Sequence, residues 1–449
     1  MKNFVEDSCF YLNEEIIQIS RKTLSYEFSM DISKVHDNIN PKINNINDMS
    51  SFMDKYINLI LIIDNIVEQS ISCLKKIIKI YIKDIPMLIN KKFIDEESLA
   101  IKTIKLVGDK HNNGERVAIL ETLSKKLVFK PRSLKSDRIF ENLIILLNST
   151  LKEERYINIY PRTIDCYKYG WVEYIDTQKQ ASLNKDHFAS KLGVLTALFQ
   201  VLNTSDIHED NILIYASYPV VIDFETLAHN NTIYENKEKI DSKYILKSLL
   251  IESYSRNNLI YKARTINRLL NKNEMKLNDR LLKKEINPLF IIDENLESFF
   301  DGYEKGLMFI QNKKVEINEL IYKYRNCISR FIPRNTSFYQ NLINIMMNPI
   351  LYRDFNKCKE FLRIILEDNK LNRIVEYEIS SLLKCDVPYF YTKFNSVNLY
   401  HDKEIIDNFF KVPINKIIKS NIEENWIEEL TYQKDIVYHY LNVSPKCTT

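Results

Sequence analysis

The first hundred residues carry the hydrophobic pattern of helices. Residues 54–82 place apolar side chains at spacings of three and four, and they contain no proline or glycine. That spacing gathers the apolar side chains on one face of a helix, where they can pack against a core. We therefore predict an N-terminal helical region over residues 1–100.

After residue 100 the pattern changes to short strands. The segments 103–107, 116–122 and 125–133 are short, rich in β-branched residues and separated by turn-forming residues. The last two are close enough to form a hairpin. Together with an amphipathic helix at 136–151, they predict a small and mainly antiparallel sheet within 101–175.

The pattern returns to helix in the second half of the chain. Residues 167–175 are interpreted as an edge strand that continues as a connector, and residues 186–204 as a helix with Asp in its first turn. A short strand follows at 218–223. Beyond about residue 235 the pattern is almost entirely helical, and the basic segment 262–287 favours a solvated pair of surface helices over a peptide-docking surface.

This order of elements predicts an α+β protein with two lobes. A small antiparallel-sheet lobe at 101–172 follows the helical region 1–100, and a mostly helical lobe spans 173–449. The same layout is found in kinases, which hold a nucleotide between a β-rich lobe and a helical lobe.

Composition narrows the class further. The chain has 449 residues, 45% of them hydrophobic and 27% charged, which is typical of a soluble globular protein. A net charge of only +3 gives no support for general nucleic-acid binding. No signal peptide is visible, and the longest aliphatic run, residues 59–63, is far below the roughly 18 residues of a membrane span.

The seven cysteines are scattered and odd in number, and none forms a CxxC motif. This distribution indicates a reducing cytoplasm, and it argues against a disulfide framework and against a cysteine-rich zinc site. Glycine is scarce as well, since only six are present and two of them, Gly108 and Gly114, flank one seven-residue segment. That segment is either an ordinary turn or a loop whose backbone geometry serves a site.

Residues 206–227 place a polar cluster between two apolar runs. Asp206 and Asn211 have the spacing of the catalytic Asp and metal-binding Asn of kinase loops. Asp223 follows at the end of a strand, and Glu225 stands where kinases have glycine. A loop and a cap would explain the same residues, and Asp-x₄-Asn alone is a weak signal.

Phosphoryl transfer would use each of these groups. Asp206 would orient the attacking hydroxyl, whereas the oxygens of Asn211, Asp223 and Glu225 would hold Mg²⁺. Lys130, at the end of a strand, would steady the phosphates of ATP. Because the chain has no GxGxxG loop, the turn at 108–114 is the candidate for covering those phosphates.

Seven segments together resemble the dehydratase half of class II lanthipeptide synthetases (LanM type). They occur in the order GDKHNNGERVAIL, KLVFKPRSL, YGWVEYI, LNTSDIHEDNIL, YPVVIDFETL, RFIPRNTSFY and LLKCDVPYFYTK. The resemblance covers roughly residues 100–395. It implies a lipid-kinase-like fold with extra helices and a two-step reaction on a precursor peptide. Ser and Thr of the precursor are phosphorylated with ATP and Mg²⁺, and the phosphate is then eliminated to give dehydroalanine or dehydrobutyrine.

The resemblance also implies a role for each matching residue. The phosphorylation site would comprise Asp206, His208, Asn211, Asp223 and Glu225. Phosphorylation, elimination or both would use Asp109, His111 and Lys130, and elimination would need Arg330 and Thr336. Glu173, in the predicted connector, is assigned to nucleotide binding. By itself, His208 is more typical of a packed loop histidine, and Arg330 and Thr336 of a helix-end ion pair and a cap.

Two departures from the family pattern limit the prediction. The N-terminal portion is shorter than usual, which leaves recognition of the leader of the precursor peptide open. Residues 396–449 contain one cysteine, one tryptophan and no glycine, unlike the zinc-dependent cyclase half of a full synthetase. We therefore predict no zinc and no ring closure by this chain, with a separate cyclase as a partner left open. The alternatives to a dehydratase are a kinase that stops at the phosphorylated product and an inactive peptide-binding partner.

Overall fold

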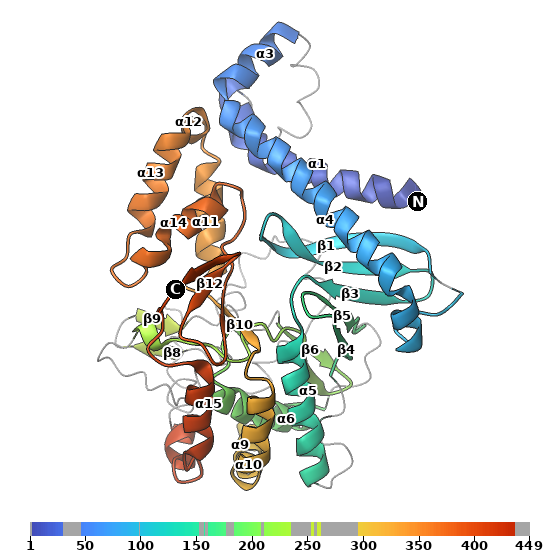
Figure 1. The fold of residues 1–449 in the computed structure, drawn as a ribbon, viewed down its shortest axis with the longest axis vertical. Coiled ribbons are helices and arrows are strands. Elements are labelled where there is room, and N and C mark those ends of the chain that lie inside the picture. The colour runs from blue at the N-terminus through green and yellow to red at the C-terminus, as the bar shows by residue number, and fades with distance from the viewer. Residues whose placement is uncertain are drawn as a thin grey trace.

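A computed structural model describes residues 2–29, 46–97, 99–151, 157, 160–176, 184–207, 211–234, 253–255, 258–261 and 295–435. In these parts the protein mixes helices with antiparallel sheets, which confirms the predicted combination of the two (Figure 1). The more specific prediction, a kinase-like fold with two lobes, stays a prediction.

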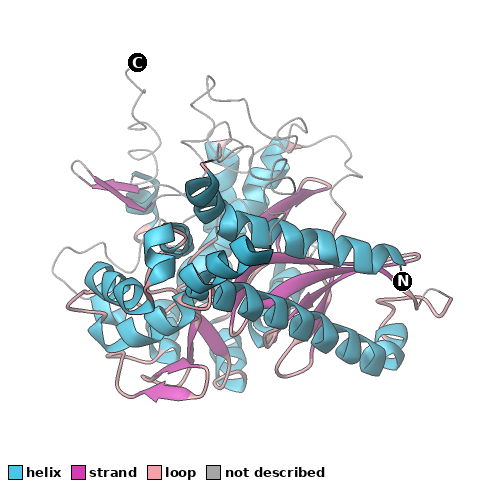
Figure 2. Cartoon of the chain, turned by 90° about the horizontal axis from the view of Figure 1, so that it is seen from above, coloured by secondary structure: helices cyan, strands magenta, loops and turns pink. Residues whose placement is uncertain are grey.

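The N-terminal region is helical, as the spacing predicts. It contains α1 (Lys2–Phe28), α3 (Ile46–Lys55) and the long α4 (Ile57–Asn90). Seen from above, long helices lie alongside the strands of the large sheet (Figure 2). Buried residues in the first half of α4 pack against a helical group, and those in its second half pack against the sheet.

By length and composition alone, α4 passes the test for a membrane-spanning helix. This is weak evidence, since core helices of other proteins pass the same test, and the buried side chains of α4 belong to two hydrophobic clusters. The expectation that no segment spans a membrane stays a prediction.

The five-stranded sheet forms where the short strands are expected. Its order is β1-β2-β3-β5-β4, and all neighbours are antiparallel. The strands are β1 (Ile101–His111), β2 (Glu115–Thr122), β3 (Lys126–Lys130), β4 (Thr163–Asp165) and β5 (Gly170–Glu173). The predicted edge strand is wrong, because β5 pairs on both sides and the edge is β4. The pattern within β5 could not show this, since the three-residue β4 is too short to give a signal of its own.

Below this sheet lies the largest hydrophobic cluster of the described residues. Helix α6 (Lys185–Leu202) packs along α9 (Leu296–Asn312) at very short range. A Cβ on Gly193 would lie 2.0 Å from the carbonyl oxygen of Phe299, and one on Gly302 would lie 1.8 Å from that of Ser190. These two glycines are therefore needed for the approach of the helices. The other helices here are α5 (Lys135–Leu151), α10 (Lys314–Lys323) and α15 (Ile414–Glu423).

The prediction that the chain is almost all helical beyond residue 235 is wrong. A four-stranded sheet has the order β10-β11-β12-β13, with β10 (Ile328–Phe331), β11 (Phe390–Lys393), β12 (Leu399–His401) and β13 (Glu404–Ile406). Its strands have three or four residues, too few to show a period of two. There are also two hairpins, β6 (Ile212–Tyr215) with β7 (Tyr218–Val221), and β8 (Ser253–Ser255) with β9 (Asn258–Tyr261). The predicted helix pair at 262–287 lies outside the described residues.

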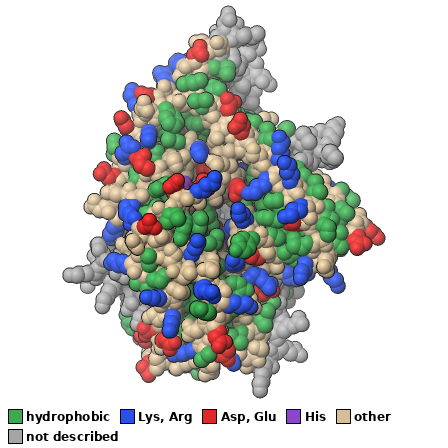
Figure 3. Space-filling view, in the orientation of Figure 1, with side chains coloured by type: hydrophobic (Ala, Val, Ile, Leu, Met, Phe, Trp, Pro, Cys, Tyr) green, Lys and Arg blue, Asp and Glu red, His purple; other side chains and the backbone are tan. Residues whose placement is uncertain are grey.

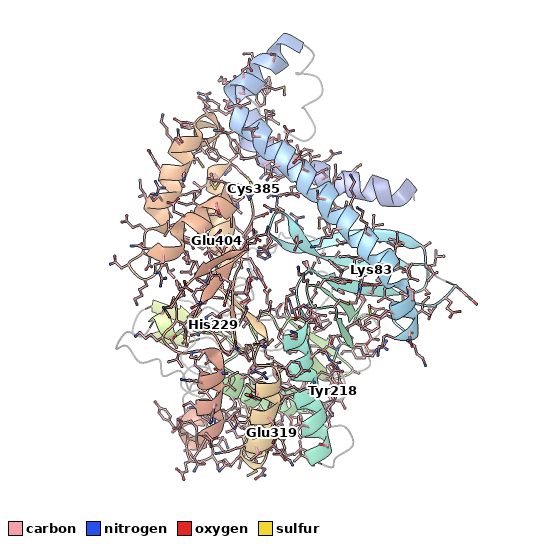
Figure 4. The ribbon with its side chains drawn as sticks, viewed as in Figure 1. Lys83, Tyr218, His229, Glu319, Cys385 and Glu404 are labelled. Carbon is pink, nitrogen blue, oxygen red and sulfur yellow. The ribbon has the colours of Figure 1, made fainter. Side chains whose placement is uncertain are left out.

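Four described helices lie between β10 and β11. They are α11 (Thr336–Met346), α12 (Pro349–Arg353), α13 (Phe355–Leu366) and α14 (Val375–Leu382), with a 3-10 turn, η5 (Asn372–Ile374), before α14. Another 3-10 turn, η3 (Thr232–Tyr234), follows β7. Figure 4 places Cys385, just after α14, on the side of this group, and Lys83 of α4 on the side of the five-stranded sheet.

Candidate active site

The polar loop before β6 is fixed by a second loop that follows β7. Backbone and side-chain hydrogen bonds join residues 203–205 to residues 226–229; for example, the Thr204 hydroxyl donates to the Leu227 carbonyl at 2.6 Å. Asp206 adopts a left-handed backbone conformation with φ of +62°. Such a conformation is uncommon outside glycine, and it persists where surrounding contacts hold it in place. The contacts between the loops therefore fix the backbone that carries Asp206.

Lys130 and Asp223 meet at the end of β3. The Lys130 ammonium lies 3.3 Å from Asp223 Oδ1 and donates to the Ile222 carbonyl at 2.6 Å. Only 6% of the lysine side chain is exposed, against 26% for the aspartate. The two residues, 93 positions apart in the chain, therefore form one partly accessible ion pair. The sequence predicts that they lie close together, whereas their roles toward ATP and Mg²⁺ stay predictions.

A third charge in this cluster was not predicted. Arg132 donates to Asp223 Oδ1 at 2.6 Å and to Asp137, in the first turn of α5, at 2.8 Å. Burial would raise the pKa of Asp223, but Lys130 and Arg132 hold it well below its usual range. Asp223 therefore stays ionised between two cations. The only sequence signal for Arg132 is its place in KPRS, two residues after Lys130.

Asn211 lies beside Asp223 because the hairpin β6–β7 aligns them. The Ile222 amide donates to the Asn211 carbonyl at 3.0 Å, and the Asn211 side-chain amide donates to the Asp206 carbonyl at 2.9 Å. The loop, the hairpin and the end of β3 thus meet in one place, and the predicted proximity of Lys130, Asn211 and Asp223 is present.

The oxygens here suit a metal that is bound together with a nucleotide. Within the described parts of the chain, no group of three or more His, Cys, Asp or Glu residues offers a site built from protein alone. Mg²⁺ needs only one or two carboxylates, since it keeps waters and takes phosphate oxygens as its other ligands. Lys130, Arg132 and the backbone amide of Glu225 all contact Asp223 through Oδ1. The donor set therefore fits Mg²⁺ that arrives with phosphates.

Glu225 links this cluster to a buried arginine. Its backbone amide donates to Asp223 Oδ1 at 3.2 Å, and its carbonyl accepts from the Arg330 amide at 2.7 Å. The Arg330 guanidinium also donates to the Glu225 carboxylate through Nη1. Burial would lower the pKa of Arg330, but Glu225 raises it above its ordinary value. Asp206 also interacts electrostatically with Arg330, so the arginine faces the predicted catalytic loop.

Arg330 has one donor left over. Its side chain is only 6% exposed, yet Nε is buried and has no hydrogen-bond partner among the described residues. A buried unsatisfied donor costs free energy, and in native proteins it calls for an explanation such as a ligand. An anion bound next to Glu225 would accept a hydrogen bond from this Nε.

His111, at the end of β1, lies close to Arg330. Its Nδ1 is 2.7 Å from the carbonyl oxygen of Val387. A carbonyl oxygen only accepts, so Nδ1 carries the hydrogen and Nε2 of the neutral ring carries the lone pair. Burial, and then the charge of Arg330, lowers the pKa of His111 to about 3. The turn after His111 is also anchored, because Asp386 accepts from the backbone amides of Asn113 and Gly114.

Asp109 and Thr336 are connected through one helix. Gln340 of α11 donates to Asp109 at 2.9 Å, and Thr336 is the first residue of the same helix. Residues four apart lie on the same side of a helix. The structure thus brings the first turns of α11 to β1 at Asp109, two residues before His111.

Two predicted residues do not join this network. Glu173 pairs instead with Arg162, at 3.0 Å, and the arginine also donates to backbone carbonyls at the end of α4. The assignment of Glu173 to nucleotide binding gains no contact from the described residues. His208 lies outside the residues that the structure describes.

Figure 3 shows Lys and Arg side chains on both sides of the middle of the face drawn. His229 belongs to the loop that holds residues 203–205. Its ring stacks on Phe331 of β10 at 5.6 Å between ring centroids, and Figure 4 places it beside that strand. The fold and site therefore define an α and β protein with a partly buried ion-pair network, in which Arg330 keeps a buried donor without a partner among the described residues.

Comparison with known proteins gives the family. A family described as a domain of unknown function (DUF4135) matches residues 56–255 and 271–393. These ranges cover well over half of the chain and include every predicted site residue, so the chain belongs to this family. The predicted resemblance to the dehydratase region of LanM-type synthetases is confirmed.

A curated relative adds a biological setting. The lacticin 481/lactococcin biosynthesis protein LcnDR2 of Lactococcus lactis subsp. lactis is 26% identical over 381 residues. The alignment covers 75% of this chain and 41% of the relative. The chain therefore spans less than half of the length of the relative.

Proposed function

We propose that this chain acts in lanthipeptide biosynthesis as an ATP-dependent dehydratase of a precursor peptide. It first phosphorylates Ser and Thr residues and then eliminates the phosphate, which leaves dehydroalanine or dehydrobutyrine. The family match and the printed function of the relative support the biosynthetic setting. The two-step chemistry is supported by the geometry of the site.

The phosphorylation step uses the end of the network around Asp223. Asp206 orients the attacking hydroxyl of the peptide, and Lys130 provides a point charge for the phosphates. Asn211, Asp223 and Glu225 would hold Mg²⁺, which neutralises phosphate charge when it is bound. The support for this assignment is the proximity of Lys130 and Asn211 to Asp223. We propose on the same basis that the fold is kinase-like, with the five-stranded sheet as one lobe.

The elimination step uses the end around Arg330. A serine hydroxyl is a poor leaving group and its phosphate ester is a good one, so elimination needs a base for the Cα proton and cations for the departing phosphate. His111 would take the proton at Nε2 once a bound phosphate offsets the charge of Arg330 that lowers the pKa of His111, while Arg330 binds phosphate oxygens. Thr336, at the start of α11, provides a further hydrogen-bond donor.

One observation carries the proposal more than any other. Arg330 is buried, keeps an Nε donor without a partner among the described residues, and bonds to Glu225, whose amide donates to Asp223. An anion site is thus joined to the Asp223 cluster through two consecutive contacts. A peptide phosphorylated at one end of this network would present its phosphate to the other.

Coexpression with a candidate precursor peptide, followed by mass spectrometry, tests the proposal. A dehydratase removes one water for each modified residue. A kinase that stops early adds one HPO₃ unit for each, and an inactive partner leaves the mass unchanged. The second or third outcome would reject the proposed function.

A further inference from the structure

Tyr389 lies close to two of the residues that we assign to elimination, Arg330 and His111. Its ring centroid is 5.3 Å from the guanidinium carbon of Arg330 and 5.4 Å from the ring centroid of His111. In the described part of the chain, no residue forms a hydrogen bond with its hydroxyl. A phenol in this position is a donor that a ligand can use.

The second sheet explains why Tyr389 lies there. Arg330 of β10 pairs with Tyr391 of β11, and side chains two residues apart point to the same side of a strand. Tyr389 therefore lies on the side of Arg330. The carbonyl of Val387, two residues earlier, holds His111 through Nδ1. Residues 387–389 thus position both the proposed base and the phenol.

The charges near the phenol belong to both ends of the network. Tyr389 interacts electrostatically with Glu225, Arg330, Arg132 and Asp223. Burial, followed by the charge of Glu225, raises the pKa of Tyr389 well above its ordinary value. The hydroxyl therefore keeps its proton at neutral pH and acts as a hydrogen-bond donor.

We propose that the Tyr389 hydroxyl donates a hydrogen bond to the phosphate oxygen that departs during elimination, a role that rests on the proposed dehydratase function. The base takes the Cα proton, and that electron pair forms the Cα=Cβ bond. The Cβ–O bond breaks, and the phosphate leaves with the bonding pair. Tyr389 keeps its own proton, and its hydrogen bond strengthens as charge develops on the departing oxygen.

The test uses a synthetic phosphoserine peptide, so that elimination is measured without prior phosphorylation. Tyr389→Phe removes only the hydroxyl. Tyr391→Phe is the matched control, since it makes the same change two residues away, where the ring stacks on Tyr400. We expect Y389F to lower kcat for phosphate release by about 10²-fold, with a much smaller change in KM. Y391F should stay within about twofold of wild type, the typical scale for a change without a lost contact.

A second readout guards against a folding defect. Inorganic phosphate should inhibit the wild-type enzyme as a product, and Y389F should need about tenfold more phosphate for the same inhibition, as expected for one lost hydrogen bond to a charged group. Phosphate release and phosphate inhibition that both match wild type in Y389F would overturn the role of Tyr389 alone. A wild-type enzyme that leaves the phosphopeptide intact would instead reject the proposed function, and this role with it.

Discussion

The two ends of the ion-pair network differ in how their cations are paired. At one end, Arg132 is shared between two carboxylates, Asp137 and Asp223, and Lys130 adds a second cation to Asp223. At the other end, Arg330 has one carboxylate, Glu225, and keeps a buried donor without a partner in the described residues. Each end balances its charges, with two cations and two carboxylates at the first and one of each at the second, but only the second keeps a buried hydrogen-bond donor without a partner among the described residues. We infer that the Asp223 end is preformed and that the Arg330 end would be completed by the phosphate that the proposed reaction brings.

The largest effect should come from the residue that orients the hydroxyl. We expect Asp206→Ala to lower the phosphorylation rate by about 10³-fold, since general-base groups contribute 10²–10⁴-fold. The measurement is transfer of labelled γ-phosphate from ATP to a precursor peptide. Asp186→Ala, which makes the same change on an exposed residue of α6, should retain the wild-type rate. A rate for D206A within about tenfold of wild type, below that range, would contradict the assignment.

The variant Arg330→Ala should separate phosphorylation from elimination, because it removes the buried Nε donor that has no partner among the described residues. With Arg330→Ala, elimination from a phosphopeptide should slow by about 10²-fold, because a preorganised donor to developing charge is lost. Phosphorylated peptide should then accumulate in the mass spectrum. Arg325→Ala, an exposed arginine on the same segment, is the control. A melting temperature is measured alongside, since the variant leaves the partly buried Glu225 without its cation. Fully dehydrated product from R330A at the wild-type rate would reject the elimination role.

A smaller effect is expected where the protein already supplies two cations. Arg132→Lys keeps the charge but cannot bridge Asp137 and Asp223 as a fork does. We expect phosphorylation to slow by about tenfold, because Lys130 still neutralises Asp223. Arg138→Lys, the same change at a half-exposed neighbouring residue of α5, should have no effect. If R132K lowered the phosphorylation rate as much as D206A does, Lys130 would not compensate for the loss of Arg132 beside Asp223.

A further prediction concerns the free energy of unfolding and its dependence on pH, not a reaction rate. Because His111 has a pKa of about 3 in the folded protein and about 6.5 when unfolded, the unfolded chain binds more protons between these values. Stability from this group is therefore lost as pH falls below about 6.5, by about 2 kcal/mol between pH 7 and pH 5. Urea unfolding at both pH values should show that His111→Gln loses less stability on acidification than wild type. An equal loss in both proteins would show that His111 is not held neutral.

The sequence predicts those parts of the site that follow from local order. The strand before Lys130, the hairpin between Asn211 and Asp223, and the helix before Asp206 are each encoded within a few residues. The motif spacing therefore places these side chains correctly. Arg132 and Tyr389 were missed because their environment arises only when α5, β10 and β11 come together. Nothing in KPRS or DVPYFY distinguishes these residues from ordinary surface or core positions.

The fold shows the same division. Long periodic helices and the hairpin of β2 and β3 are predicted because their signals are local. The second sheet was missed because β10 and β11 have four residues each and pair across the intervening helices α11–α14. Pairing over that separation is decided by tertiary contacts, and no pattern within either strand reveals it.

The central claim is that one network passes the same phosphate from ATP to the peptide and then releases it. A single-turnover reaction with γ-labelled ATP and precursor peptide follows that phosphate directly. The label should appear first on the peptide and then as inorganic phosphate, in step with the loss of water from the peptide. Label that reaches inorganic phosphate without passing through the peptide, or that stays on the peptide indefinitely, would contradict the claim.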